Sequence, residues 1–353
     1  MKKSTSKSEL HDLAIIIDGC APILRDCDNA AFWIEGGATC ALATVALHDD
    51  TRTSTLDTIG RLYSQIKDRD DVIIALHAED IIQVKKEGKF AIVLAFQSGA
   101  ALDRNVDMIE VYYRLGVRSM NLAYNQAEAA ADGCSEPRNG GLTLFGHQVI
   151  PEMNRVGMLL DLSHTGHRAT MEAMDLSDAP VTFSHSNAKS LYDHPRNLAD
   201  DQILRCAEMG GVIGLNGHPA FIKAGTAAPS LNDYVAQVDT MVDKAGIDHV
   251  GIGLDFSHPP GHQMPRSRYE KLIAQGVFTT RTLPQPPWYY PIGDARRISE
   301  LTEALTRRGW SEKDLRKLLG ENFLRLFRAV WKPKNLSIPS RVCRASNSCT
   351  ISQ

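Results

Sequence analysis

Seven short apolar runs in this sequence each lead directly into a residue that can bind a metal or carry a proton. The residues at the ends of these runs are Asp18 with Cys20, Gln97, Tyr124, His164, His185, Asn216 with His218, and Asp255. Each run is too short for a helix and rich in apolar side chains, which is typical of a strand buried on both faces of a parallel sheet. Functional groups at successive strand ends are the arrangement of a (β/α)8 barrel, whose C-terminal rim carries the chemistry. The sequence therefore predicts this fold.

Segments with helical periodicity separate the predicted strands. They are residues 54–67, 106–115, 146–156, 168–177, 199–209 and 231–245. A further strand over residues 39–45, with His48 shortly after it, brings the predicted strands to eight. Strands that alternate with helices through short turns favour right-handed parallel crossovers, and eight such units close a barrel. The sequence argues against a nucleotide-binding fold, since no glycine-rich phosphate loop lies between a predicted strand and a predicted helix.

We expect residues 1–332 to form one barrel domain, for which a chain of 353 residues is long enough. Residues 258–292, rich in proline, glycine and aromatic side chains, follow the last predicted strand. They form either a lid over the barrel mouth or a surface loop without a catalytic role. Helices are predicted again over residues 299–308 and 312–331, beside or beneath the barrel. The Ser- and Arg-rich tail, residues 333–353, is predicted to be disordered.

The charge and composition of the chain indicate that its binding partner is a small molecule. The formal net charge is -3 and the Lys and Arg residues are scattered, so we expect no nucleic acid partner. The first twelve residues contain no apolar stretch, so we expect no secretory signal, no membrane span and a cytoplasmic location. The seven cysteines are widely spaced and form no CxxC pair, which argues against a disulfide framework.

Two histidines at the ends of consecutive predicted strands indicate a metal site. Each alone is more often an ordinary hydrogen-bonded residue, but His164 and His185 at equivalent strand ends would present two imidazoles to one divalent cation, for which zinc is the expected ion. Asp255 ends the last strand, on the rim across from the first, where a carboxylate can take a proton from water; the alternative is a helix cap or loop ion pair. Arg196, in the loop after His185, can hold a substrate carboxylate or form an ordinary surface ion pair.

Longer motifs resemble the membrane dipeptidase (renal dipeptidase, peptidase M19) family of the amidohydrolase superfamily, over about residues 13–331. The motifs are residues 151–158 leading into 161–164, then 184–186, 194–197, and 246–253 before Asp255. The resemblance implies a barrel that hydrolyses dipeptides with two zinc ions bridged by a hydroxide, and it suggests a homodimer. By the same resemblance, His164 and His185 match the histidines of one zinc. Asp255 matches the catalytic aspartate and Arg196 the arginine that binds the dipeptide carboxylate.

The sequence departs from the family pattern at the other zinc. Cys20 and Pro22 stand where the family has a His-x-Asp pair, and Gln97 stands where it has the glutamate that bridges both metals. Tyr124 replaces a histidine that contacts substrate. Because a thiol, a pyrrolidine and an amide supply little negative charge, we expect at most one zinc ion, held by His164 and His185 with Gln97 or Asp255.

These observations favour a metal-dependent hydrolase that cleaves an amide-type bond in a small carboxylate-bearing substrate. Asp255 is the expected base, Arg196 the carboxylate anchor, and Tyr124 or His218 the group that polarises the scissile bond. Cys20 either faces the substrate or metal as a thiol, or fills the space of the missing ion. Two alternatives remain: a non-hydrolytic enzyme catalysing elimination, decarboxylation or rearrangement with Cys20 or Tyr124 as proton carrier, and a catalytically silent binding protein.

Overall fold

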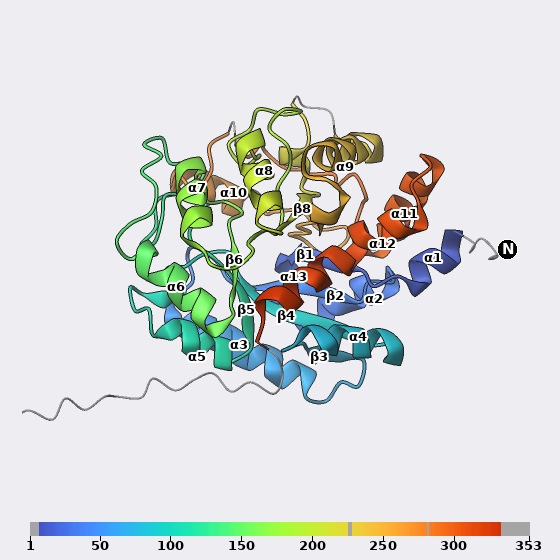
Figure 1. Cartoon of the computed structure of the whole chain (residues 1–353), viewed down its shortest axis with the longest axis horizontal. Helices are drawn as coiled ribbons and strands as arrows, with labels where there is room; N and C mark the ends of the chain where they lie inside the picture. Colours follow the sequence, from blue (N-terminus) through green and yellow to red (C-terminus); the bar gives the residue numbers. More distant parts are fainter. Residues whose placement is uncertain (1–6, 225–227, 281, 333–353) are drawn as a thin grey trace, which may run out of the picture.

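The computed structural model describes residues 7–224, 228–280 and 282–332, so the predicted tail over residues 333–353 lies outside the described residues. Within the described ranges, nine parallel strands form one sheet (Figure 1). The strands are β1 (Ile17–Ala21), β2 (Cys40–Ala46), β3 (Val72–Ile74), β4 (Phe90–Phe96), β5 (Val117–Asn121), β6 (Leu159–Asp161), β7 (Thr182–Phe183), β8 (Val212–Asn216) and β9 (Val250–Gly253).

All of these strands except β3 close into a barrel, because β2 pairs with both β1 and β4, and β9 pairs with β1. Strand β3 pairs with the first half of β4, and β5 pairs with the second half of the same strand. The eight barrel strands coincide with the eight predicted runs, which confirms the (β/α)8 fold. The C-terminal ends of the strands therefore meet at one rim.

Helices surround the barrel (Figure 1). They are α1 (Lys7–Leu13), α2 (Ala30–Glu35), α3 (Arg52–Ile66), α4 (Ala78–Glu87), α5 (Met108–Arg114), α6 (Gly146–Val156), α7 (His167–Leu176), α8 (Asp200–Glu208), α9 (Leu231–Ala245), α10 (Arg266–Ala274), α11 (Ile298–Arg307), α12 (Glu312–Arg316) and α13 (Asn322–Val330). Helices α6 and α9 have the predicted bounds. Within the described ranges, none of these helices has the length and apolar character needed to cross a bilayer.

The helix predicted over residues 312–331 is interrupted by a π-helical turn, Lys317–Glu321, between α12 and α13. This turn brings Gly320 against the strand that begins the barrel: a Cβ added at Gly320 would lie 2.4 Å from the backbone oxygen of Ile15. Beyond it, α13 places Phe323 among the buried side chains of β1, β2, β4 and β8. The C-terminal helix thus packs against the barrel strands themselves.

The barrel interior narrows around the carbonyl group of Ser184. A Cβ added at Gly19, Gly214 or Gly253 would lie 2.5, 2.1 or 1.9 Å from the Ser184 oxygen. Real Cβ atoms do not approach an oxygen so closely, so these positions accept only glycine. The close approach holds β1, β8 and β9 against the residue that precedes His185.

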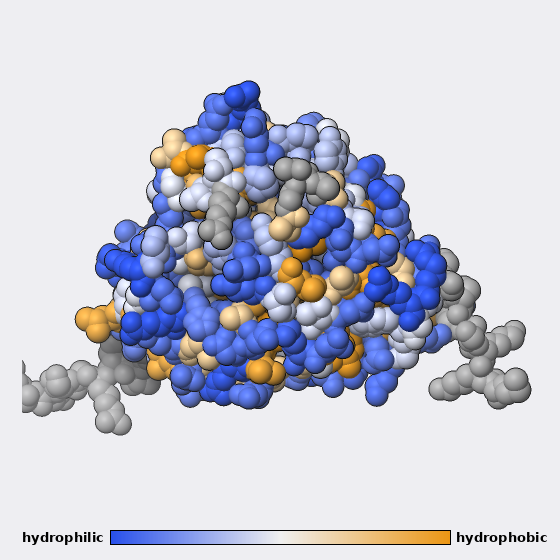
Figure 2. All heavy atoms as spheres, turned by 90° about the horizontal axis from the view of Figure 1, so that it is seen from above, coloured by the Kyte–Doolittle hydropathy of each residue, from blue (hydrophilic) through white to orange (hydrophobic). Residues whose placement is uncertain are grey.

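The segment over residues 258–292 is not a plain loop. It contains α10, and side chains on both sides of that helix form a separate apolar cluster with Phe221. Sequence periodicity did not indicate α10, because only Tyr269 and Leu272 of its nine residues are buried. On the face drawn in Figure 2, apolar side chains are scattered among hydrophilic ones, as is usual for an exposed surface.

Candidate functional site

The two predicted metal-binding histidines lie side by side at the rim. His164 follows β6 and His185 follows β7, and the two strands are paired. Their Nε2 atoms are 2.8 Å apart, and both rings are buried. His164 has a left-handed backbone with φ of 65°, an uncommon conformation for a residue with a Cβ, which turns its side chain toward its neighbour.

Hydrogen bonds assign the protons of both rings. Nδ1 of His164 lies 2.7 Å from Oδ1 of Asn125, whose amide nitrogen donates to the carbonyl of Val277. Nδ1 of His185 lies 2.8 Å from Oγ of Ser184, and that hydroxyl donates to the buried carboxylate of Asp161. In both rings the partner atom accepts, so Nδ1 carries the proton and Nε2 keeps its lone pair.

Both rings are held neutral. Burial lowers the pKa of His164 and His185 well below the usual value, and the positive charge of Arg196 lowers both further. Two Nε2 atoms at this distance need either a ring proton or a metal cation between them. In a metal-binding histidine, one ring nitrogen binds the metal and the other usually donates its proton to an acceptor, which fixes the ring. The pair therefore fits a divalent cation.

Cys20 and Asp255 complete a group of potential ligands. The thiol of Cys20, a ring nitrogen of His185 and a carboxylate oxygen of Asp255 all lie within 4.8 Å of one another. The prediction that Asp255 lies across the rim from the first strand was wrong: β9 pairs directly with β1, and the Asp255 amide donates to the Cys20 carbonyl at 2.9 Å. The Asp255 carboxylate accepts hydrogen bonds from Asn216 and from the Cys20 thiol. Burial raises the pKa of Asp255 to about 6, and Arg196 acts in the opposite direction.

Gln97 presents its amide nitrogen to this group. Its Nε2 donates to Sγ of Cys20 at 3.1 Å and to Oγ1 of Thr44 at 2.8 Å. Since an amide binds a metal through its oxygen, the predicted ligand role of Gln97 requires the amide to turn. Pro22, two residues beyond Cys20, begins a 3-10 turn and has no ligand atom.

Tyr124 lies between two imidazole rings. Its ring stacks on His164 with centroids 4.0 Å apart and on His48 with centroids 4.8 Å apart. Burial raises the pKa of Tyr124, so its hydroxyl stays protonated and can donate to a substrate. His48 was not among the predicted site residues, although it follows a predicted strand and its buried Nδ1 has no partner among the described residues.

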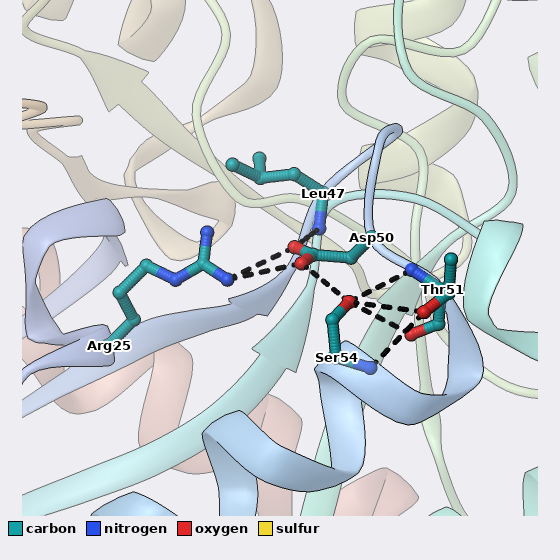
Figure 3. Close-up of polar contacts among 5 residues, drawn as sticks. All are labelled: Arg25, Leu47, Asp50, Thr51 and Ser54. Atoms are coloured by element: carbon teal, nitrogen blue, oxygen red, sulfur yellow. Dashed lines mark hydrogen bonds and ion pairs between the residues drawn. The ribbon is translucent and has the colours of Figure 1, made fainter.

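A fixed turn after β2 carries His48 to the rim. Asp50 accepts hydrogen bonds from the Leu47 amide at 2.9 Å and from the Ser54 hydroxyl at 2.9 Å, and forms an ion pair with Arg25 (Figure 3). Thr51 and Ser54 cap the start of α3 in the same view. The carboxylate of Asp50 thus ties the turn to α3 and to the 3-10 turn that follows β1.

Arg196 is buried, with 3% of its surface exposed. Its Nη2 donates to the His185 carbonyl at 3.0 Å, and its Nε has no partner. Within the described ranges it forms no ion pair with a carboxylate. The guanidinium lies 5.5 Å from the ring centroid of Phe221. A buried cation without a counter-ion is costly, so this position favours an anionic ligand.

His218 follows β8 and lies in an aromatic environment. Its Nδ1 accepts a hydrogen bond from the Ala220 amide, and its ring contacts Phe221 and Trp288 with centroids 5.0 and 4.8 Å away. Burial lowers the pKa of His218 to about 3. The ring is therefore neutral at ordinary pH, and His218 lines the larger cavity.

Two cavities meet this site. A cavity of about 530 Å³ is lined by His48, Gln97, Tyr124, His164, His218 and Asp255, by apolar side chains, and by the charged side chains of Arg25, Asp26 and Arg268. A second cavity, of about 300 Å³, is lined by Arg196, Cys134, Lys189 and His167 and shares His164 with the first. The larger volume is within the range of small-molecule sites. Arg196 thus lines the smaller cavity, which adjoins the larger one at His164.

A closed parallel barrel with imidazoles and a carboxylate at its C-terminal rim defines the amidohydrolase-like class of barrel proteins. The sequence model of the membrane dipeptidase family (peptidase family M19) matches residues 24–275 and 289–338. The chain belongs to this family. The match begins after Cys20 and Pro22 and omits residues 276–288.

Relatives agree with this assignment. An amidohydrolase from Pseudomonas aeruginosa of known crystal structure is 32% identical, with a TM-score of 0.84 over 92% of this chain and 99% of that one. An uncharacterized dipeptidase of Schizosaccharomyces pombe is 37% identical over 214 residues, which are 58% of this chain and 51% of the relative. Dipeptidase tcpJ of Claviceps purpurea is 28% identical over 277 residues, 78% of this chain and 59% of the relative. The chain thus spans a little over half the length of these two curated relatives.

Proposed function

We propose that this protein is a metal-dependent hydrolase with a single metal ion, which cleaves an amide-type bond in a small substrate bearing a carboxylate. The observation that carries the proposal is the close approach of the Nε2 atoms of His164 and His185, 2.8 Å apart at the rim of the barrel. Family membership supports the reaction class, since curated relatives are described as dipeptidases. The substrate and the number of ions are inferred from the donors in this chain.

A single ion suits these donors better than two. His164 and His185 offer neutral nitrogens, and Asp255 offers the one carboxylate of the neighbouring group. On the β1 side, Pro22 has no ligand atom and the Cys20 thiol shares hydrogen bonds with Gln97 and Asp255. Two dications without a bridging carboxylate would repel strongly.

The bound ion would supply Lewis-acid polarisation of the scissile carbonyl and acidify the attacking water. Asp255 would accept the proton from that water, because its carboxylate lies beside His185 and is oriented by Asn216 at 3.3 Å. The protonated hydroxyl of Tyr124, stacked on His164, would donate to the developing negative charge. The unpaired guanidinium of Arg196 would bind the substrate carboxylate.

Metal analysis of the purified full-length protein tests this proposal directly. We expect about one zinc or similar divalent ion per chain, lost in His185→Asn, and amide hydrolysis that stops on chelation and returns on adding zinc. Asn216→Ala is the companion variant that keeps the ion but weakens hydrolysis, since Asn216 orients the base and is not a ligand. Two ions per chain, or no ion and no effect of zinc, would contradict the single-ion hydrolase.

A second candidate is suggested by the contacts of Cys20. Its thiol receives a hydrogen bond from Gln97 and donates to Asp255 at 3.7 Å, so a proton can pass between sulfur and carboxylate. That pair would suit an elimination or rearrangement without attack by water. Cys20→Ala distinguishes the two: hydrolysis by Asp255 tolerates the change, whereas a reaction that needs the thiol is abolished.

A further inference from the structure

Part of the wall of the larger cavity comes from residues outside the family match. That match stops at residue 275 and resumes at residue 289. Phe278, Leu283 and Trp288 lie between these limits, and all three line the cavity beside His164 and Asp255. This chain therefore shapes part of its cavity with a segment that the family model does not match.

The segment is packed rather than free. Phe278, Leu283 and Trp288 are 7%, 2% and 5% exposed. They form one apolar cluster with Leu272 of α10 and with Phe221, which follows β8. Because the cluster shares buried side chains with the barrel loops, its cavity-facing surface is fixed before a ligand arrives.

Hydrogen bonds hold the segment in register. The Trp288 amide donates to Gln263 at 2.7 Å, and the Gln263 amide donates to the Trp288 carbonyl at 2.8 Å. The Tyr269 hydroxyl donates to the Leu283 carbonyl at 3.1 Å. The backbone carbonyls of Leu283 and Trp288 and the Trp288 amide thus have partners, and the apolar side chains of these residues line the cavity.

The wall contacts the residues of the reaction site. The ring of Phe278 meets Tyr124 edge-on with centroids 6.1 Å apart, and Trp288 meets His218 with centroids 4.8 Å apart. Tyr124 in turn stacks on His164. A substrate held at the imidazole pair therefore reaches this wall, and Ile23 and Leu47 line the same cavity from other elements.

We propose that residues 276–280 and 282–288 build a subsite for a bulky apolar or aromatic group of the substrate. The proposal rests on the proposed function for the position of the scissile bond. The carboxylate end would lie toward Arg196 and the apolar end in the cavity of about 530 Å³, which has room for an aromatic ring. An uncharged side chain is favoured, because the surface supplied by Phe278, Leu283 and Trp288 has no charge to pair with an ion.

Binding of two small amides tests the subsite without turnover. N-phenylacetylglycine and N-acetylglycine share the carboxylate and the amide and differ in the aromatic ring. In titration calorimetry on the full chain, with and without zinc, we expect the aromatic probe to bind about tenfold tighter or more, as burial of one ring predicts. Phe278→Ala should reduce that preference about fivefold or more.

Val277→Ala is the matched control. Val277 belongs to the same cluster and is 3% exposed, but it does not line the cavity. Should Phe278→Ala not fold, Leu283→Ala removes apolar surface from the same segment of the cavity lining and is expected to lower the preference as well. Equal affinity for both probes in the wild type, or equal loss of preference in Phe278→Ala and Val277→Ala, would overturn the subsite. Because the ratio requires neither hydrolysis nor zinc, a failure of the proposed hydrolase would leave this result standing.

Discussion

His164 and His185 face each other through Nε2 atoms 2.8 Å apart, while the Nδ1 of each ring is held by an acceptor. This relationship depends on two pieces of local structure. The left-handed backbone of His164 turns its ring toward the neighbouring strand, and the Ser184–Asp161 pair fixes the ring of His185. The two imidazoles are therefore preorganised for the proposed metal ion, because their close approach is established during folding.

Removing the acceptor of His164 should weaken the metal site. In Asn125→Ala, Nδ1 of His164 loses its partner at 2.7 Å, so the ring can adopt the other tautomer or turn away. We expect zinc affinity to fall about 10-fold to 100-fold, measured by competition with a chelating dye. Gln126→Ala, at a partly buried neighbour whose side-chain amide donates to the Gln275 carbonyl, is the control and should leave zinc affinity unchanged. Unchanged affinity in Asn125→Ala would show that the tautomer is set elsewhere.

Loss of the Arg196 charge should weaken binding of a carboxylate ligand but leave the stability of the protein nearly unchanged. Arg196→Met keeps much of the side-chain volume and removes a buried cation that has one protein hydrogen bond and no carboxylate partner among the described residues. The dissociation constant of N-acetylglycine should rise about 10-fold to 100-fold, while the free energy of unfolding changes by less than about 1 kcal/mol. N-acetylglycinamide, which lacks the carboxylate, should bind both proteins alike. A large loss of stability with unchanged binding would assign Arg196 a structural role.

Two glycines provide a matched test of the barrel interior. A Cβ at Gly253 would lie 1.9 Å from the Ser184 oxygen, whereas a Cβ at Gly60, in α3, meets nothing within 4 Å. Gly253→Ala should therefore lower the free energy of unfolding by more than about 3 kcal/mol, because strand β9 must move outward. Gly60→Ala should raise it by about 0.5–1 kcal/mol. Urea unfolding measures both, and a mild effect of Gly253→Ala would mean that the strands can separate there.

The sequence was sufficient to predict the barrel and the convergence of the two histidines. Short apolar runs mark strands by their length, and parallel strands bring their C-terminal ends to one rim whatever their distance along the chain. His164 and His185 could therefore be paired from sequence alone. The sequence also predicted that Asp255 lies at this rim. It was wrong only in placing Asp255 across the rim from β1, since β9 and β1 are neighbours.

Other features depend on contacts that leave no periodic signal. The apolar cluster around Phe278 joins α10 to Phe221 across about fifty residues, through a proline-rich segment without helical or strand periodicity. The orientation of the Gln97 amide toward Cys20 and Thr44 depends on side-chain rotation. The stacking of His48 on Tyr124 likewise joins two loops, and loop conformation is set by tertiary contacts rather than by local sequence.

His218 should make the stability of the protein sensitive to acid. Burial, followed by repulsion from His258, Arg196 and His194, lowers the pKa of His218 to about 3, below its usual value of 6.5. Between these two pH values the unfolded chain binds a proton at His218 that the folded chain does not. The contribution of His218 to the free energy of unfolding is therefore complete above pH 6.5 and is lost as the pH falls toward 3. His218→Phe keeps a ring against Phe221 and Trp288 but cannot be protonated.

We expect the difference in stability between His218→Phe and the wild type to depend on pH. As the pH is lowered from about 7 to about 4, urea unfolding should show the free energy of unfolding of the variant rising relative to that of the wild type by up to about 3 kcal/mol. Other titrating groups, including Asp18 and Asp255, change equally in both proteins to a first approximation and cancel in the difference. Two parallel profiles would mean that water reaches the His218 ring and that the aromatic enclosure formed by Phe221, Trp288 and Tyr290 is open in solution.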